Sequence, residues 1–166
     1  MVAYQVEELK AFTQKLFLGG EFDDFLVKEV NIVTFNHFTI DGRIRHGFYT
    51  EEERQALGLG EFSSWKLLRP VCFSLIKGRR LPESFRIDFQ AGPERVEAFL
   101  KERQILSVSK EQITGLYLHI RYEEGKLSCV TGMSLSFFTL DKGIEKEWDQ
   151  YAGMVLRGMG ILWENI

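Results

Sequence analysis

The sequence predicts one α+β domain, spanning residues 1–166, with a mostly antiparallel sheet and helices packed on it. The chain is long enough for one domain with its own core, and 45% of its residues are hydrophobic, including fourteen phenylalanines. Two stretches carry the signature of a β-hairpin, with turn signals at Asp41-Gly42 and Glu124-Gly125. Strands that come in hairpins, more than in alternation with helices, favour an antiparallel sheet.

The first half of the chain is expected to hold a helix, a hairpin and a short second helix. Apolar residues recur at helical spacing over residues 6–18, and a pair of glycines follows, where this helix should end. Residues 30–40 and 43–49 are expected to form the two strands of the first hairpin. Thr50 and Glu53 have the spacing of a capping box, which predicts that a short helix begins there.

The second half of the chain contains the remaining predicted elements. Apolar residues from Trp65 to Ile76 have helical spacing, and Pro70 is expected either to kink that helix or to mark its start. After it the sequence predicts a strand over 84–89, a helix that Pro93 opens, strands over 116–122 and 126–139, and a helix over 142–158. We expect the first and last predicted helices to cover one face of the sheet.

Several features indicate a cytoplasmic protein. No stretch approaches the roughly 18 unbroken apolar residues of a membrane-spanning helix, and the opening residues, MVAYQVEELK, lack the pattern of a signal peptide. The two cysteines, Cys72 and Cys129, lie far apart in apolar surroundings, as free thiols in a reducing compartment do. Motifs typical of nucleotide binding, zinc proteases and serine hydrolases are absent, so the sequence singles out no catalytic residue and no cofactor.

Two of the three histidines lie in the stretch NHFTIDGRIRHGF, residues 36–48. If Asp41-Gly42 is a two-residue turn, His37 lies opposite His46, and Thr39 shares their more apolar face. The pair then has three interpretations: a neutral structural pair, the lining of a ligand pocket, or part of a metal site. His119 is expected on the polar face of the second hairpin, which leaves a metal site without a third histidine.

A basic segment spans residues 66–86, with six Lys or Arg residues against one Glu in a chain whose net charge is −3. Cations near the end of a helix stabilise its dipole, and this interpretation needs no ligand. The alternative is an anion-binding patch for nucleic acid, a phosphorylated or other anionic ligand, or an acidic protein partner. Its candidate residues are Arg69, Lys77, Arg79, Arg80 and Arg86. Nucleic acid is not favoured, because no basic strand interleaved with aromatic residues and no DNA-binding motif is present.

Three stretches of the chain resemble those of small bacterial proteins that are grouped as a family of unknown function. These stretches are FTIDG (38–42), LRPVCFSLIKGRR (68–80) and LSCVTGMS (127–134). The resemblance extends over nearly the whole chain. It implies a bacterial, cytoplasmic protein, and it carries no activity, substrate or catalytic residue with it.

The sequence thus supports two hypotheses of function from different classes. The first is a non-enzymatic binding or interaction module that acts through the basic segment or through a self-association surface, as a homo-oligomer. The second is an enzyme or metal protein with a pocket around His37 and His46. Elemental analysis and binding to a polyanion would separate them, since only the second predicts a bound metal.

Overall fold

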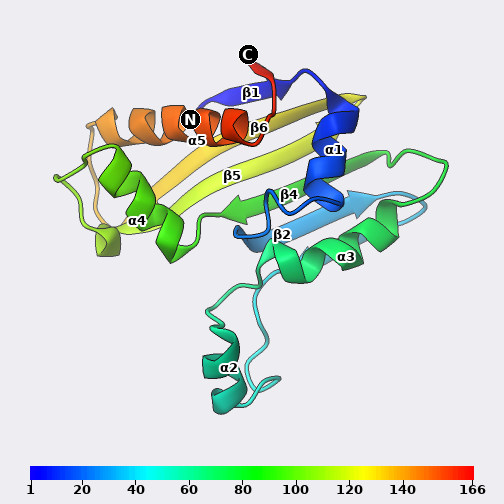
Figure 1. The fold of residues 1–166 in the computed structure, drawn as a ribbon, viewed down its shortest axis with the longest axis horizontal. Coiled ribbons are helices and arrows are strands. Elements are labelled where there is room, and N and C mark those ends of the chain that lie inside the picture. The colour runs from blue at the N-terminus through cyan, green and yellow to red at the C-terminus, as the bar shows by residue number, and fades with distance from the viewer.

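A seven-stranded sheet forms the centre of the protein in the computed structural model, which describes residues 1–166 (Figure 1). All neighbouring strands are antiparallel, in the order β3-β2-β4-β5-β6-β1-β7. The strands are β1 (Ala3–Val6), β2 (Leu26–Val33), β3 (His37–Asp41), β4 (Ser84–Gln90), β5 (Ile113–Glu123), β6 (Lys126–Leu135) and β7 (Trp163–Asn165). The predicted α+β class is therefore confirmed.

Helices cover one face of this sheet, and the other face, called the open face below, has no helix on it (Figure 1). The covering helices are α1 (Leu9–Phe17), α3 (Trp65–Ile76), α4 (Pro93–Glu102) and α5 (Gly143–Gly158). Side chains alternate along each strand, and in β4 the apolar residues Phe85, Ile87 and Phe89 point to the helices. The helices predicted at the two ends of the chain do share this face, together with α3 and α4.

The core lies between the sheet and these helices, in two clusters of buried apolar residues. The larger contains 22 residues and joins α1 and α3 to the strands, and the smaller contains nine and joins α4 and α5 to β5. The indole N–H of Trp65 donates to the buried carbonyl of Leu16 over 2.7 Å, so α3 is held against α1 with no unpaired indole. Helix α5 lies close to β1 at Gly153, where a side chain would crowd Tyr4 and Trp163.

The second predicted hairpin forms with the expected register. Strands β5 and β6 pair Glu123 with Lys126. Glu124 and Gly125 between them have φ angles of 52° and 74°, as a two-residue turn of this kind requires. His119 lies on the open face of the sheet, because it alternates with the buried residues of β5. Its prediction as a residue of the polar face is thus confirmed.

The first predicted hairpin, around Asp41-Gly42, does not form. The chain reverses earlier, at residues 34–36, so that β3 pairs with β2 and His37 lies opposite a residue of β2. Gly42 does not have the positive φ of the predicted turn. A side chain at Gly42 would instead overlap the carbonyl group of Val27. This position needs glycine because the backbone passes very close to β2, and not because the chain turns there.

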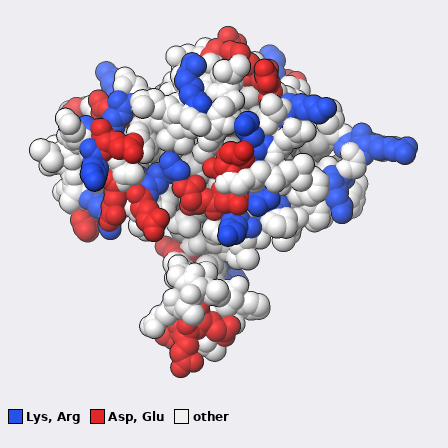
Figure 2. All heavy atoms as spheres, in the orientation of Figure 1, with Lys and Arg blue, Asp and Glu red and all other residues white.

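Residues 43–62 form an arm that projects from the body of the protein (Figure 1). An isolated β-bridge joins the two stems of the arm, and residues 43–49 do not form the predicted strand. Helix α2 (Glu51–Leu57) lies at the end of the arm, with the expected capping box of Thr50 and Glu53. No residue of the arm is buried. Figure 2 shows a group of acidic side chains at its end, where the first turn of α2 is acidic.

The remaining elements differ from the prediction mainly at their ends. Strands β1 and β7 at the sheet edge were not expected, and the first helix begins at Leu9 because the residues before it pair with β6 and β7. Pro70 lies inside α3, so it is not the start of that helix. A short 3-10 helix, η1 (Lys110–Gln112), precedes β5. None of the helices has the length and apolar character needed to cross a membrane.

Candidate functional site

The five basic candidates of the segment 66–86 do not gather at one place. Arg69 points from α3 toward Asp23, whose two carboxylate oxygens accept its Nε–H and Nη2–H over 2.9 and 3.1 Å. Arg86 lies on β4 and points to the open face, where its Nε–H donates to Asp88 over 3.0 Å. Arg69 is therefore part of an internal ion pair, and Arg86 belongs to the opposite face of the sheet from α3.

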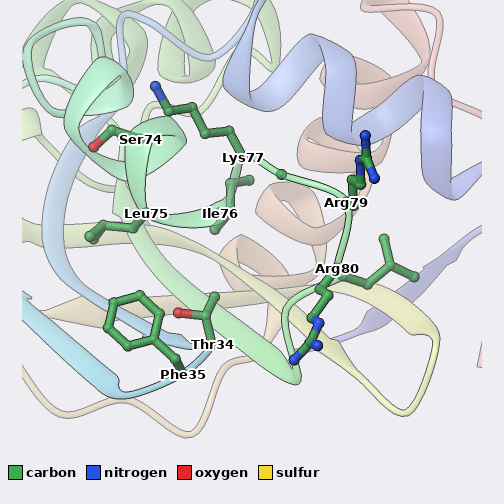
Figure 3. A pocket seen from close by; sticks show the side chains of 10 residues that line it. Thr34, Phe35, Ser74, Leu75, Ile76, Lys77, Arg79 and Arg80 are labelled. Atoms are coloured by element: carbon green, nitrogen blue, oxygen red, sulfur yellow. The ribbon is translucent and has the colours of Figure 1, made fainter.

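Lys77, Arg79 and Arg80 stay together, in the connection between α3 and β4. Lys77 directly follows the last helical residue, as the sequence predicts. All three side chains are exposed, and none forms an ion pair. In Figure 3 Lys77 and Arg79 point away from Thr34 and Phe35, whereas Arg80 points to their side. We refer to these three residues as the basic loop.

The basic loop borders a concave region of about 400 Å³. Its opposite wall comes from the turn between β2 and β3, where Phe35 is 83% exposed and the hydroxyl oxygen of Thr34 is buried without a hydrogen-bond partner (Figure 3). A second concave region, of about 390 Å³, lies next to it and is more apolar; Arg80 and Leu81 line both regions. The basic loop thus forms a charged ridge between two partly apolar hollows.

The two histidines of the stretch 36–48 do not form the expected pair. His37 lies on β3, where its Nε2 is 2.9 Å from the side-chain oxygen of Asn31, and the hydroxyl of Thr39 donates to the same oxygen over 2.9 Å. His46 lies in the arm. Both imidazoles are exposed, so the prediction of a cross-strand pair on an apolar face is wrong. No three His, Cys, Asp or Glu side chains anywhere in the protein are placed to hold a metal ion.

A group of polar residues that the sequence did not single out lies on the open face. Asp88 is one of only two buried polar residues, and its Oδ1 accepts hydrogen bonds from Nδ1 of His119 over 2.7 Å and from Nε of Arg86. Burial by itself would raise the pKa of Asp88, but the hydrogen bonds from His119 and Arg86 outweigh it and lower this pKa below its ordinary value. Asp88 is therefore an ionised carboxylate that orients two cationic or ionisable neighbours.

The side chain of His119 has room beside it on the sheet. Its ring stacks on Tyr117 with the two centroids 6.0 Å apart. On the neighbouring strand, Gly132 leaves the space near Nε2 of His119 open, since even a Cβ there would reach within 3.4 Å of that nitrogen. The alternation of β4 and β5 could have placed Asp88 and His119 on one face. Their contact, however, depends on the strand order, which the sequence does not reveal.

Comparison with known proteins identifies the family of the chain. A family model described as "Family of unknown function (DUF5721)" matches residues 15–164. The chain belongs to this family. The match confirms the resemblance seen in the sequence, and it extends over nearly the whole chain. No curated protein and no solved structure matches. The description of this family names no activity, so the function has to be argued from the geometry of the molecule.

Proposed function

We propose that the protein is a non-enzymatic binding module that contacts an extended anionic partner through the basic loop. The observation that carries this proposal is the set of three exposed cations, Lys77, Arg79 and Arg80, which have no counter-ion in the protein. Other arginines of the chain, such as Arg69 and Arg95, are held by carboxylates. Cations left without a counter-ion raise the local concentration of anionic partners and speed their association.

The shape of the region indicates the class of partner. The three side chains point in different directions, which suits an extended acidic surface better than one small anion (Figure 3). Exposed apolar side chains lie beside them, since Phe35 is 83% and Leu81 79% exposed. A protein segment that combines acidic and apolar residues would match both features. The two free thiols and the resemblance to bacterial proteins support the bacterial cytoplasm as the proposed location of this binding.

Retention on a heparin column tests the proposal, since heparin presents an extended polyanion. Replacing Lys77, Arg79 and Arg80 together with Gln should lower the salt concentration of elution markedly, because the interaction is electrostatic. The melting temperature should change by only a few degrees, because each exposed side chain contributes less than about 0.5 kcal/mol.

In a matched control, Gln replaces three other exposed lysines that have no ion pair: Lys101, Lys126 and Lys146. This variant has the same net charge as the first and should elute close to the parent protein. Equal losses of retention in the two variants would mean that only net charge matters. Unchanged retention of the Lys77, Arg79 and Arg80 variant would refute the proposal.

A further inference from the structure

Two arginines lie directly opposite each other on the open face of the sheet. Arg86 of β4 and Arg121 of β5 are in register on the two neighbouring strands, and their side chains share this face. Like charges directly opposite each other on a sheet reduce its stability. Arg121 forms no ion pair and no hydrogen bond that would offset this repulsion. The arrangement therefore carries an uncompensated positive charge near the middle of the sheet.

Asp88 offsets only part of this charge, and it does so in a way that leaves donors free. It holds Arg86 through Nε, so the two terminal nitrogens of that guanidinium have no partner within the protein. An ionised carboxylate can only accept hydrogen bonds, so Nδ1 of His119 must donate to Asp88. In the neutral imidazole Nε2 is then the acceptor. Asp88 thus holds the guanidinium of Arg86, whose terminal N–H groups remain free to donate, and the imidazole of His119, whose Nε2 remains free to accept.

A groove of about 430 Å³ runs along this face beside the two arginines. Its polar wall contains Asn31, His37 and Ser84, and Glu123 is its one carboxylate. Glu123 forms no ion pair with either arginine. Arg86 of the basic segment and His37 of the histidine stretch therefore line the same groove, although they are far apart in the sequence.

We propose that this groove binds a small oxyanion, a phosphate monoester or a carboxylate, between Arg86 and Arg121. A guanidinium group presents a fork of N–H donors that matches both anions, and two facing guanidinium groups enclose one anion from both sides. A bound anion also removes the repulsion between the arginines, so binding and stability are coupled. His119 lies two residues from Arg121 on the same face and acts on the site through Asp88, because it holds the carboxylate that also binds Arg86.

This site is separate from the basic loop, and the two suit ligands of different size. The basic loop is an exposed ridge that suits an extended partner, whereas the arginine pair lies in a groove on the opposite face of the sheet from α3. A single small anion can engage both guanidinium groups of the pair. The two proposals therefore fail or succeed separately, and different variants test them.

Titration of the ¹⁵N-labelled protein with sodium phosphate, and separately with sodium acetate, at constant ionic strength tests the site. We expect saturable shifts of the backbone amides around Arg86 and Arg121, with a dissociation constant in the range of about 1–10 mM for such small probes. Tighter binding of phosphate assigns the site to phosphate monoesters, and tighter binding of acetate assigns it to carboxylates. If neither probe produces saturable shifts in these strands, the proposal is wrong.

Single-residue variants show whether the anion binds at the arginine pair. Replacing Arg121 with Gln should raise the dissociation constant about tenfold, since one charged hydrogen-bonding partner is lost. The same variant should be at least as stable as the parent, because the repulsion with Arg86 disappears. Arg45→Gln on the arm, which also removes one exposed arginine without an ion pair, should bind within about twofold of the parent.

The basic loop provides the second control. The variant that lacks Lys77, Arg79 and Arg80 should retain the shifts in β4 and β5 while losing retention on heparin. Shifts that appear instead around residues 77–81, or an Arg121→Gln variant that binds the probes as tightly as the parent does, would overturn the assignment of the site to the arginine pair.

Discussion

Arg69 should behave as a structural residue although it lies within the basic segment. Its guanidinium donates two hydrogen bonds to Asp23, over 2.9 and 3.1 Å, and thereby joins α3 to the loop between α1 and β2. We propose to replace it with Met, which keeps the aliphatic stem and removes the charge. Asp23 would then keep its carboxylate without its partner.

The exposed fractions of the two side chains set the expected magnitude. Arg69 and Asp23 are 21% and 20% exposed, so the pair lies between the surface and the interior. Exposed pairs contribute up to about 1 kcal/mol, and removal of one partner of a buried pair costs about 3–5 kcal/mol. We therefore expect Arg69→Met to lower the free energy of unfolding by about 2 kcal/mol. For a chain of this length the melting temperature should fall by about 4–8 °C.

Urea unfolding of a double-mutant cycle measures the pair itself. Asp23→Asn alone should also destabilise the protein, and the double variant should cost less than the two single variants together, with a coupling of about 1–2 kcal/mol. Lys77→Met, eight positions along the same segment, should change stability by less than about 0.5 kcal/mol. A coupling near zero, or equal effects of the Arg69 and Lys77 variants, would refute the structural role of Arg69.

Two further predictions concern buried titratable groups. Because the pKa of Asp88 is lowered in the folded protein, its stabilising contribution is complete above about pH 5 and disappears as pH falls through the folded pKa. Asp88→Asn should therefore lose less stability than the parent between pH 5 and pH 3 in urea unfolding, and parallel profiles would contradict the ionised network. Burial raises the pKa of Cys72 to about 12 and also raises that of Cys129. Neither thiol should react with iodoacetamide at pH 8 until urea unfolds the protein, and rapid labelling of the native protein would show that the core opens readily.

The two hairpins illustrate how far local sequence predicts structure. Glu124-Gly125 and Asp41-Gly42 carry similar turn signals, yet only the first forms the expected turn. At Glu124-Gly125 the glycine is needed for a positive φ, which is a local requirement. At Gly42 the glycine is needed because the backbone passes next to Val27, and this contact depends on how the arm leaves the sheet. The same residue type therefore has two causes, and only one of them is visible in the sequence.

The candidate site was predicted in part, for similar reasons. The basic loop was found because its residues are neighbours in the chain and follow directly after α3. Arg69 was assigned to the same patch because the sequence does not show where a helical side chain points or that Asp23 lies opposite it. Asp88 and His119 were not connected, since they are separated along the chain and meet only where β4 pairs with β5.

By itself the sequence determined the α+β class, most of the helices and the second hairpin, because these follow from periodicity, capping and turn residues within short stretches. The family was indicated separately, by the resemblance of three stretches to known bacterial proteins. Only the tertiary structure decided which charges remain free. Arg69 is neutralised by Asp23, Arg86 is held by Asp88, and Arg121 is left opposite Arg86 with no counter-ion. The physical reason is that an ion pair requires a charged nitrogen and a carboxylate oxygen within about 4 Å of each other. Strand order and helix packing decide which residues, far apart in the chain, come that close.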